Sequence, residues 1–464
     1  MRVFKSDAMP GLTYGWIVMA VLGAAVAFLG GSSRVDVVQL IALRPLAFLL
    51  LIPALYLATS ERLRPGRTPI MLMVALMALM TLQLLPLPPA VWQSLPGRET
   101  IAEFEKVAGL GENWRPLSLV PGRTLNTLMS LAIPFCALIA ALSSGFRSVT
   151  ILAAIAIVGV VDASLGILQV ASGGTGALYY YAVTNEGTPV GIFANQNHSA
   201  VFSALCMMIL VQIGTSGEHG LRGAGAKTVI GALYVLVLIA ALLSGSRAGF
   251  LLTMLAVLFT IFTLWQAIAG SSSAARPRLL RKLPAPSARL LLGFVVLSLA
   301  SVIAAFAVMG SAPAAGSFAE TANFDDMRVR IFPVLVEMLS VFWLPGSGFG
   351  SFEEVYHMFE PAELLSPYYI NQAHNDWLQF AIEGGIAGIV WLAVALAWLL
   401  KAVWAMRNHG DGALRHTVFW LAIIATIVLA SAVDYPLRTP IFQLVLGWLA
   451  AALVVQKARY RVRA

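Results

Sequence analysis

The sequence predicts an all-α polytopic membrane protein, with about 12 transmembrane helices in one integral membrane domain over residues 1–464. Of the 464 residues, 59% are hydrophobic and 11% are charged, whereas a water-soluble domain carries roughly 25% charged residues. Apolar runs of roughly 17 to 23 residues, long enough to cross a hydrocarbon core, recur along the whole chain. The predicted spans are 14–31, 37–58, 69–85, 124–142, 149–171, 199–215, 228–243, 248–266, 290–310, 380–404, 416–433 and 440–456.

Positive charge sets the expected orientation of these spans. With the N-terminus in the cytoplasm, the cytoplasmic connections carry roughly twice as many Lys and Arg residues as the opposite connections, which are much longer. Both termini are therefore predicted to be cytoplasmic. The formal net charge of +8 is then a topology signal, and no nucleic-acid partner is expected.

Two long connections fall on the outer side, at 86–123 and at 311–379, the second just before the tenth predicted helix. In the second connection, residues 325–342 have helical spacing of apolar positions, and the stretch Pro345–Gly350 then predicts a turn. Connections of this length in compact domains are usually functional. The glycines at 346, 348 and 350 are not expected to form a nucleotide loop, because the Lys of a P-loop is missing.

Chemically capable side chains gather on the outer side, whereas the cytoplasmic connections hold little besides charge, Gly and Ser. Any site is therefore expected to face outward. The candidates are Asn195, Asn197, His198, Arg247, Arg328, Arg330, His357, His374, Asn375, Asp376, Glu383, Asp434 and Arg438.

Three arginines are candidates for holding a diphosphate through bidentate hydrogen bonds. Arg247 lies between two nearly abutting spans, where an arginine is costly unless it is paired or binds an anion; the alternative is a snorkelling topology residue. Arg328 and Arg330 point about 200° apart on a helix, so one of them, with Arg328 preferred, is expected to face the site. The alternative is a solvated helix with local acidic partners at 325 and 326.

His374 stands at the start of a predicted span and can take a proton from a hydroxyl. We interpret it as a general base, with Asn375 beside it. Glu383 lies further along the same helix and either orients a site group or hydrogen-bonds a neighbouring helix. Asp434 and Arg438 line the site or simply pair with each other across the last outer turn.

The stretch Asn195 to His198 precedes another span. Asn197 is a natural N-cap for that helix, and lining a substrate cavity is the other interpretation for Asn195, Asn197 and His198. No metal site is predicted, because the sequence lacks His-x-x-x-His, Asp-x-Asp and any carboxylate cluster near a histidine on one helix. No cofactor is expected.

Taken in order, four motifs resemble the O-antigen ligase and O-antigen polymerase superfamily. They are Gly191–His198, Ser244–Gly249, Arg328–Phe332 with Leu344–Phe352, and His374–Gln379 with Glu383–Gly388. The resemblance covers about 150–440, the ligase- and polymerase-like core. It implies a fold similar to the metal-independent C-type glycosyltransferases, in the bacterial inner membrane, with a site that faces the periplasm.

The resemblance also implies a reaction. A glycan moves from an undecaprenyl-diphosphate donor, a polyprenyl-diphosphate-linked saccharide, to a hydroxyl on a saccharide or glycolipid acceptor, with membrane lipid around the site. His374 matches the family's general base, and Arg247 and Arg328 match the arginines that bind the donor diphosphate. We favour the ligase type. The alternatives are a Wzy-type polymerase of O-antigen or exopolysaccharide repeats and, from another class, a transporter or lipid-saccharide flippase.

Overall fold

The computed structural model describes residues 10–34, 36–216, 223–269, 315–365, 370–407 and 413–463. The predicted fold class is confirmed: within these ranges, ten helices are long and apolar enough to cross a membrane. An eleventh, shorter apolar stretch, Tyr14–Leu29, matches the first predicted span. The predicted span at 290–310 lies outside the described residues.

The described chain divides into two compact units. The first unit combines the N-terminal helices, the two long connections and most of the last helices. Its elements are α1 (Pro10–Leu29), α2 (Gln39–Tyr56), α3 (Ser60–Leu63), η1 (Arg64–Gly66), α4 (Arg67–Gln83), β1 (Pro86–Leu87), α5 (Pro89–Trp92), α6 (Glu99–Val107), β2 (Arg115–Pro116), α7 (Pro121–Ser130), α8 (Ala132–Ser143), α14 (Ala315–Phe342) from Asn323 on, α15 (Phe352–Tyr356), η2 (Ala362–Leu364), α16 (Asp376–Trp404) to Ala402, η3 (Pro436–Arg438) and α18 (Pro440–Arg463) to Val455.

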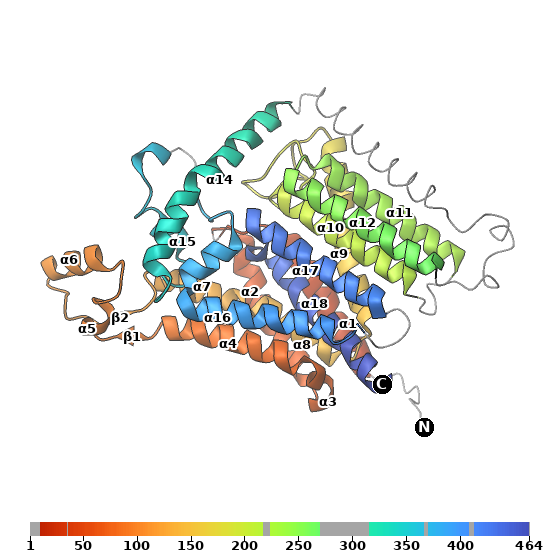
Figure 1. Ribbon diagram of the computed structural model, residues 1–464, viewed down its shortest axis with the longest axis horizontal. Coiled ribbons are helices and arrows are strands. Elements are labelled where there is room, and N and C mark those ends of the chain that lie inside the picture. Colours follow the sequence, from red (N-terminus) through yellow and green to blue (C-terminus); the bar gives the residue numbers. More distant parts are fainter. Residues whose placement is uncertain are drawn as a thin grey trace. The chain divides into compact units, whose positions relative to one another are not determined.

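The second unit contains four helices that pack side by side (Figure 1), together with most of α17 (Ala413–Val433). The four are α9 (Ser148–Ala171), α10 (Gln196–Thr215), α11 (Ala224–Leu243) and α12 (Arg247–Ala269). Only three residues separate α11 from α12, and Gly245 makes this turn at φ 67°. The prediction that two nearly abutting spans flank Arg247 is therefore confirmed.

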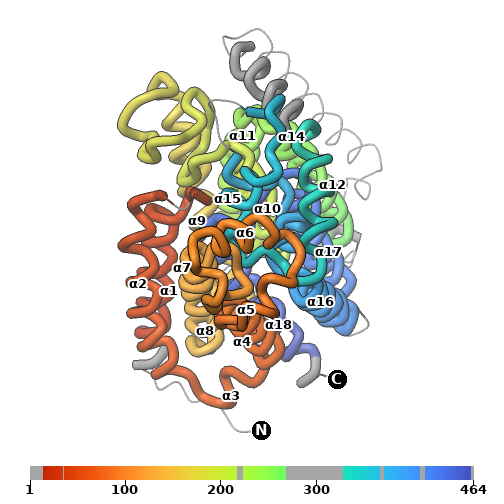
Figure 2. The backbone as a smooth tube through the Cα atoms, turned by 90° about the vertical axis from the view of Figure 1, so that its left-hand side faces the viewer, coloured from red at the N-terminus to blue at the C-terminus, as the bar shows by residue number. Residues whose placement is uncertain are grey.

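Helices α1 and α2 run together in the first unit, and α8 contacts both (Figure 2). The connection 86–123 is ordered: β1 and β2 form a short antiparallel ladder with Pro86 opposite Pro116. Trp92 is buried there, and its indole Nε1 donates to the Asn113 carbonyl at 2.9 Å. The side chain of Trp114, in contrast, is exposed.

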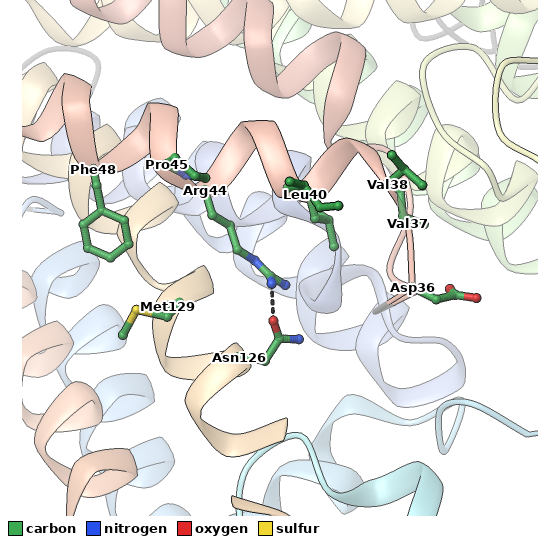
Figure 3. A pocket seen from close by; sticks show the side chains of 10 residues that line it. Asp36, Val37, Val38, Leu40, Arg44, Pro45, Phe48, Asn126 and Met129 are labelled. Carbon is green, nitrogen blue, oxygen red and sulfur yellow. Dashed lines mark hydrogen bonds between the residues drawn. The ribbon is translucent and has the colours of Figure 1, made fainter. Parts of the chain in front are cut away.

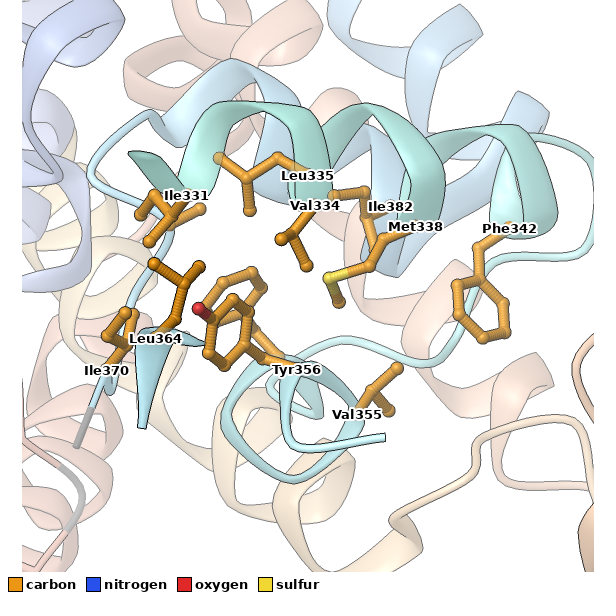
Figure 4. Close-up of a cluster of buried hydrophobic side chains, with 12 residues drawn as sticks. Ile331, Val334, Leu335, Met338, Phe342, Val355, Tyr356, Leu364, Ile370 and Ile382 are labelled. Carbon is orange, nitrogen blue, oxygen red and sulfur yellow. The ribbon is translucent and has the colours of Figure 1, made fainter. Parts of the chain in front are cut away.

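The large connection is a packed structure built on α14, as its helical spacing predicts. The residues of one face of α14 are buried against α15, η2 and the first part of α16 (Figure 4). This cluster comprises Ile331, Val334, Leu335, Met338, Phe342, Phe352, Val355, Tyr356, Leu364, Ile370, Ala373 and Ile382. Because the helix positions follow i, i+3, i+4 and i+7, one stripe of α14 supplies the hydrophobic contact. This packing fixes the face of α14 that carries Arg328.

Candidate functional site

The start of α16 positions the predicted base. Asn375 caps this helix: its Oδ1 accepts from the backbone N–H of Trp377 at 3.1 Å and of Leu378 at 3.0 Å. Its Nδ2 donates to the Ala432 carbonyl at 3.0 Å, which ties the cap to the end of α17. The role of Asn375 in this arrangement is to fix where α16 begins and therefore where His374 lies.

His374 has a backbone conformation unlike that of any other non-glycine residue in the described chain, with φ at 50°. Such a conformation costs free energy and persists only where the surroundings impose it. The imidazole Nδ1 lies 3.5 Å from Oδ1 of Asp434, and the ring packs edge-to-face on Tyr435 with centroids 4.7 Å apart. His374 keeps 18% of its side chain exposed, whereas Asp434 keeps 3%. One nitrogen therefore faces a buried carboxylate, and Nε2 is the nitrogen left for other chemistry.

Asp434 also contacts an arginine of α14. Nη2 of Arg328 lies 3.4 Å from Oδ2 of Asp434, so one carboxylate contacts both the candidate base and a candidate anion-binding group. Arg330 turns away, as the helical geometry predicts, and donates to the Glu363 carbonyl at 3.1 Å. Of the two arginines of α14, the structure brings Arg328 to Asp434, the carboxylate that faces His374, and it holds Arg330 against η2.

The prediction that Asp434 pairs with Arg438 is wrong. Arg438 instead donates from Nη1 to Glu383 at 2.8 Å and from Nε to Asp376 at 3.4 Å. Burial alone would lower the pKa of the Arg438 guanidinium, but the two carboxylates raise it above its ordinary value. Arg438 therefore stays charged. Its Nη2 is buried and makes no hydrogen bond in the described chain.

Asp376, which follows the cap residue, is a buried junction. One carboxylate oxygen accepts from the Ser431 hydroxyl at 3.0 Å and from the Leu437 backbone N–H at 3.2 Å. The other carboxylate oxygen contacts Arg438. Asp376 therefore links the start of α16 to Ser431, which precedes Asp434, and to Leu437 and Arg438, which follow it. Asp376 was among the outward polar residues in the sequence, but nothing there marked it as this link.

Glu383 is fully buried at a break in α16. Gly385 has φ 59° and ψ −157°, so the helix is interrupted there. The Gly348 N–H donates to the Glu383 carbonyl at 3.0 Å, and the Ile386 N–H donates to the Leu344 carbonyl at 3.2 Å. The glycine-rich turn after α14, Pro345–Gly350, thus packs against the break in α16 and supplies hydrogen-bond partners for its backbone. Its glycines are explained by close backbone approach, in agreement with the prediction against a nucleotide loop.

A buried arginine supports the same turn from the first long connection. Arg98 is 2% exposed and donates to the carbonyls of Pro96, at 2.9 Å, and of Leu117 and Gly346. Burial lowers the pKa of Arg98 to about 10, partly offset by Glu99. Sequence reasoning missed this residue, because an arginine in an outer connection has no pattern that distinguishes a buried one from a solvated one.

Two glutamates that follow this turn also form ion pairs. Arg123 in α7 forms ion pairs with both Glu353 and Glu354 of α15. Both glutamates are therefore ion-paired across the two long connections. His357 lies just beyond, exposed, with Nδ1 3.0 Å from Glu360, outside the group around His374.

In the second unit, the stretch before α10 is held by backbone hydrogen bonds. The N-cap is Asn195, whose Oδ1 accepts from the Asn197 N–H at 2.8 Å, so the assignment of the cap to Asn197 is wrong by two residues. His198 is buried at 1% exposure and packs edge-to-face on Phe193.

Asp162 organises this stretch from inside α9. Fully buried, it accepts from the Ile192 N–H at 2.8 Å and from the Ser199 hydroxyl at 2.9 Å. Gly191 is required because a Cβ there would lie 2.0 Å from Asp162 Oδ1. The sequence signal for a structural or functional role of Asp162 was its position as the one acidic residue of the predicted span 149–171.

Arg247, also in the second unit, is the first residue of α12 and is exposed. Ser246 precedes it, and its Oγ accepts from the Gly249 N–H at 2.9 Å, as an N-cap does. In the described ranges, no three His, Cys, Asp or Glu residues are grouped so that they could hold a metal ion.

The comparisons with known proteins agree with the motifs. Residues 232–393 match the family model for O-antigen ligase. The resemblance to the O-antigen ligase and polymerase superfamily is thus confirmed over a segment that includes Arg247, Arg328 and His374. The match supports a ligase- or polymerase-type function in a multi-pass membrane protein. No curated protein matches the chain.

Proposed function

We propose that this chain is an O-antigen ligase-like glycosyltransferase of the bacterial inner membrane. It moves a glycan from an undecaprenyl-diphosphate donor to a saccharide hydroxyl on the periplasmic side. The observation that carries the proposal is the contact of His374 Nδ1 with buried Asp434 at 3.5 Å, within a chain whose residues 232–393 match the O-antigen ligase family.

The proposed reaction needs a base and an anion-binding group. The acceptor hydroxyl oxygen attacks the anomeric carbon of the donor, the bond from this carbon to the diphosphate oxygen breaks, and undecaprenyl diphosphate leaves. His374 takes the hydroxyl proton on Nε2, a contribution of roughly 10²–10⁴ to the rate. Asp434, 3.5 Å from Nδ1, stabilises the imidazolium that forms. The 3.5 Å separation fits a free enzyme, since catalytic hydrogen bonds often tighten only when substrate binds.

The arginines are proposed to stabilise negative charge on the leaving diphosphate, as fixed cations do without having to reorganise. Arg328 is the best supported, because it contacts the carboxylate that faces His374. Donor binding by Arg247 rests on the resemblance of the turn at 244–249. Arg330 is the weakest of the three candidates for donor binding, because its hydrogen bond to the Glu363 carbonyl directs it elsewhere, and only a small contribution is expected from it. Glu383 and Arg438 form the buried ion pair behind this region.

The experiment replaces His374 by Ala in cells that make the glycan, with membrane level and folding of the variant verified. We expect the lipid-linked donor to accumulate on the periplasmic side. Accumulated full-length chains indicate a ligase, whereas accumulated single repeats indicate a polymerase. Wild-type glycan in the variant contradicts the role of His374, and donor retained on the cytoplasmic side indicates a flippase instead.

A further inference from the structure

A cavity of about 700 Å³ lies in the first unit between α2 and α7 (Figure 3), and its lining includes none of the residues proposed for the transfer reaction. Apolar side chains form most of its wall, and Arg44 and Asn126 provide the polar groups at its centre. The lining residues of this α2–α7 pocket are Asp36, Val37, Val38, Leu40, Ile41, Arg44, Pro45, Phe48, Asn126 and Met129.

Arg44 is the only charged residue within α2, a helix whose sequence otherwise suits the hydrocarbon core. Its Nη1 donates to Oδ1 of Asn126 (Figure 3). Among the described residues, no carboxylate lies within ion-pair distance of Arg44; the acid on the rim, Asp36, pairs with Arg34 at 2.7 Å. A guanidinium in an apolar span is costly unless an anion or a strong acceptor accompanies it. The pocket therefore has an uncompensated positive charge.

Arg44 lies in the first half of α2. It is five residues into the helix, or about 7.5 Å along the axis at 1.5 Å per residue, and a long arginine side chain near a helix end can extend its guanidinium toward the lipid headgroups. Beyond it, Leu49, Ile52 and Leu55 are exposed along the helix and offer an apolar track for an acyl chain. A ligand is therefore expected to enter from the bilayer.

A further acceptor lies on the same wall. Pro45 has no N–H, so it cannot donate to the carbonyl of Ile41 one turn earlier, and both residues line the pocket. The Ile41 carbonyl thus lacks the usual helical donor, so it can accept from a hydroxyl group. The pocket offers one guanidinium and one amide, a donor set that suits a single phosphodiester. A diphosphate carries more negative charge and would need several cationic groups.

We infer that the α2–α7 pocket binds an anionic phospholipid with a hydroxyl-bearing headgroup, of which phosphatidylglycerol is the test case. Arg44 and the Asn126 amide hold the phosphate, the Ile41 carbonyl accepts from the headgroup hydroxyl, and one acyl chain lies along α2. This is a lipid site separate from the proposed transfer chemistry.

The test is lipid binding to the purified full-length protein, followed by native mass spectrometry and thermal melting in phosphatidylglycerol and in zwitterionic phosphatidylcholine. We expect selective binding of phosphatidylglycerol, about tenfold weaker in Arg44→Gln, as for loss of one charge-assisted hydrogen bond. The matched control Arg67→Gln removes an exposed arginine from the first turn of α4, outside the pocket, and should bind as the wild type does.

Equal affinity of wild type and Arg44→Gln overturns the inference, as does equal binding of phosphatidylcholine. If Arg44→Gln does not fold, Arg44→Lys and Asn126→Ala are measured instead, and each should weaken phosphatidylglycerol binding. Farnesyl diphosphate is the third probe. If it binds in an Arg44-dependent manner and phosphatidylglycerol does not, the pocket is a diphosphate site, and the inference fails without any consequence for His374.

Discussion

The starts of α16 and α10 look alike in sequence but differ in what surrounds them. Each has an asparagine cap and a histidine close by: Asn375 follows His374 directly, and Asn195 precedes His198 by three positions. At α10, His198 is buried, and the nearby acid, Asp162, is occupied by a backbone N–H and a hydroxyl. At α16, His374 is partly exposed and faces an acid that also contacts an arginine.

An asparagine cap with a histidine close by is therefore not by itself a catalytic signal. Around α10, the side chains of Asn195 and Asp162 accept from backbone N–H groups and from the Ser199 hydroxyl, as expected of groups that hold a buried turn. Around α16, the partly exposed His374 faces Asp434, and Asp434 also contacts Arg328 of α14. We therefore expect substitutions around α16 to impair chemistry, and substitutions around α10 to impair stability.

The largest effect is expected from His374→Ala. Loss of the general base should lower the transfer rate by roughly 10²–10⁴ without a change in melting temperature, because the side chain is partly exposed and packs mainly on Tyr435. The measurement is transfer by purified protein. His357→Ala, which removes an exposed histidine from the same connection, is the matched control and should keep full activity.

Gly385→Ala is expected to damage folding itself. An added Cβ would lie 2.5 Å from the Gly346 nitrogen and 2.6 Å from the Leu344 carbonyl, at a φ that costs a non-glycine residue about 1–3 kcal/mol before any clash. We expect a large drop in melting temperature. The control is Gly388→Ala in the same helix, where the nearest atom is 3.4 Å away; similar losses in both variants would contradict the role of the break.

Arg328→Ala and Arg330→Ala separate two neighbouring arginines. Arg328 should matter for donor binding by about 10- to 100-fold in kcat/KM, the size expected for one charge-assisted hydrogen bond to a buried anion. Arg330, whose observed partner is an exposed carbonyl, should change kcat/KM by less than about threefold. Equal losses would indicate that both arginines reach the donor.

The smallest effect on chemistry is expected from Asp162→Ala. It leaves the Ile192 N–H and the Ser199 hydroxyl without their acceptor, which should cost about 1–3 kcal/mol in the free energy of unfolding. Activity per folded molecule should be unchanged. Asp162→Asn keeps an acceptor oxygen and should lose less stability, so a large loss of activity in this stable variant would contradict the structural role of the α10 start.

Much of the fold could be predicted because it depends on local pattern. The apolar runs correspond to the observed helices, and the spacing of Ile331, Val334, Leu335 and Met338 gave the buried face of α14. The same periodicity gave the divergence of the two arginines of α14.

The site was less predictable because its contacts join distant parts of the chain. Asp434 is separated by 106 positions from Arg328, and no local pattern specifies that pairing. The break at Gly385 lies inside a predicted span, where Glu383 and two glycines interrupt the apolar residues but do not specify which segment packs against them. The local pairing of Asp434 with Arg438 failed because Glu383 and Asp376 supply two carboxylates to that arginine.

The most direct test of the account is a double-mutant cycle on His374 and Asp434, measured as kcat/KM for glycan transfer by purified, folded protein. If Asp434 acts through His374, Asp434→Asn lowers activity strongly in the wild type and adds almost nothing once His374 is Ala. If the two losses multiply, the residues act independently. If His374→Ala retains wild-type transfer, the proposed base is wrong.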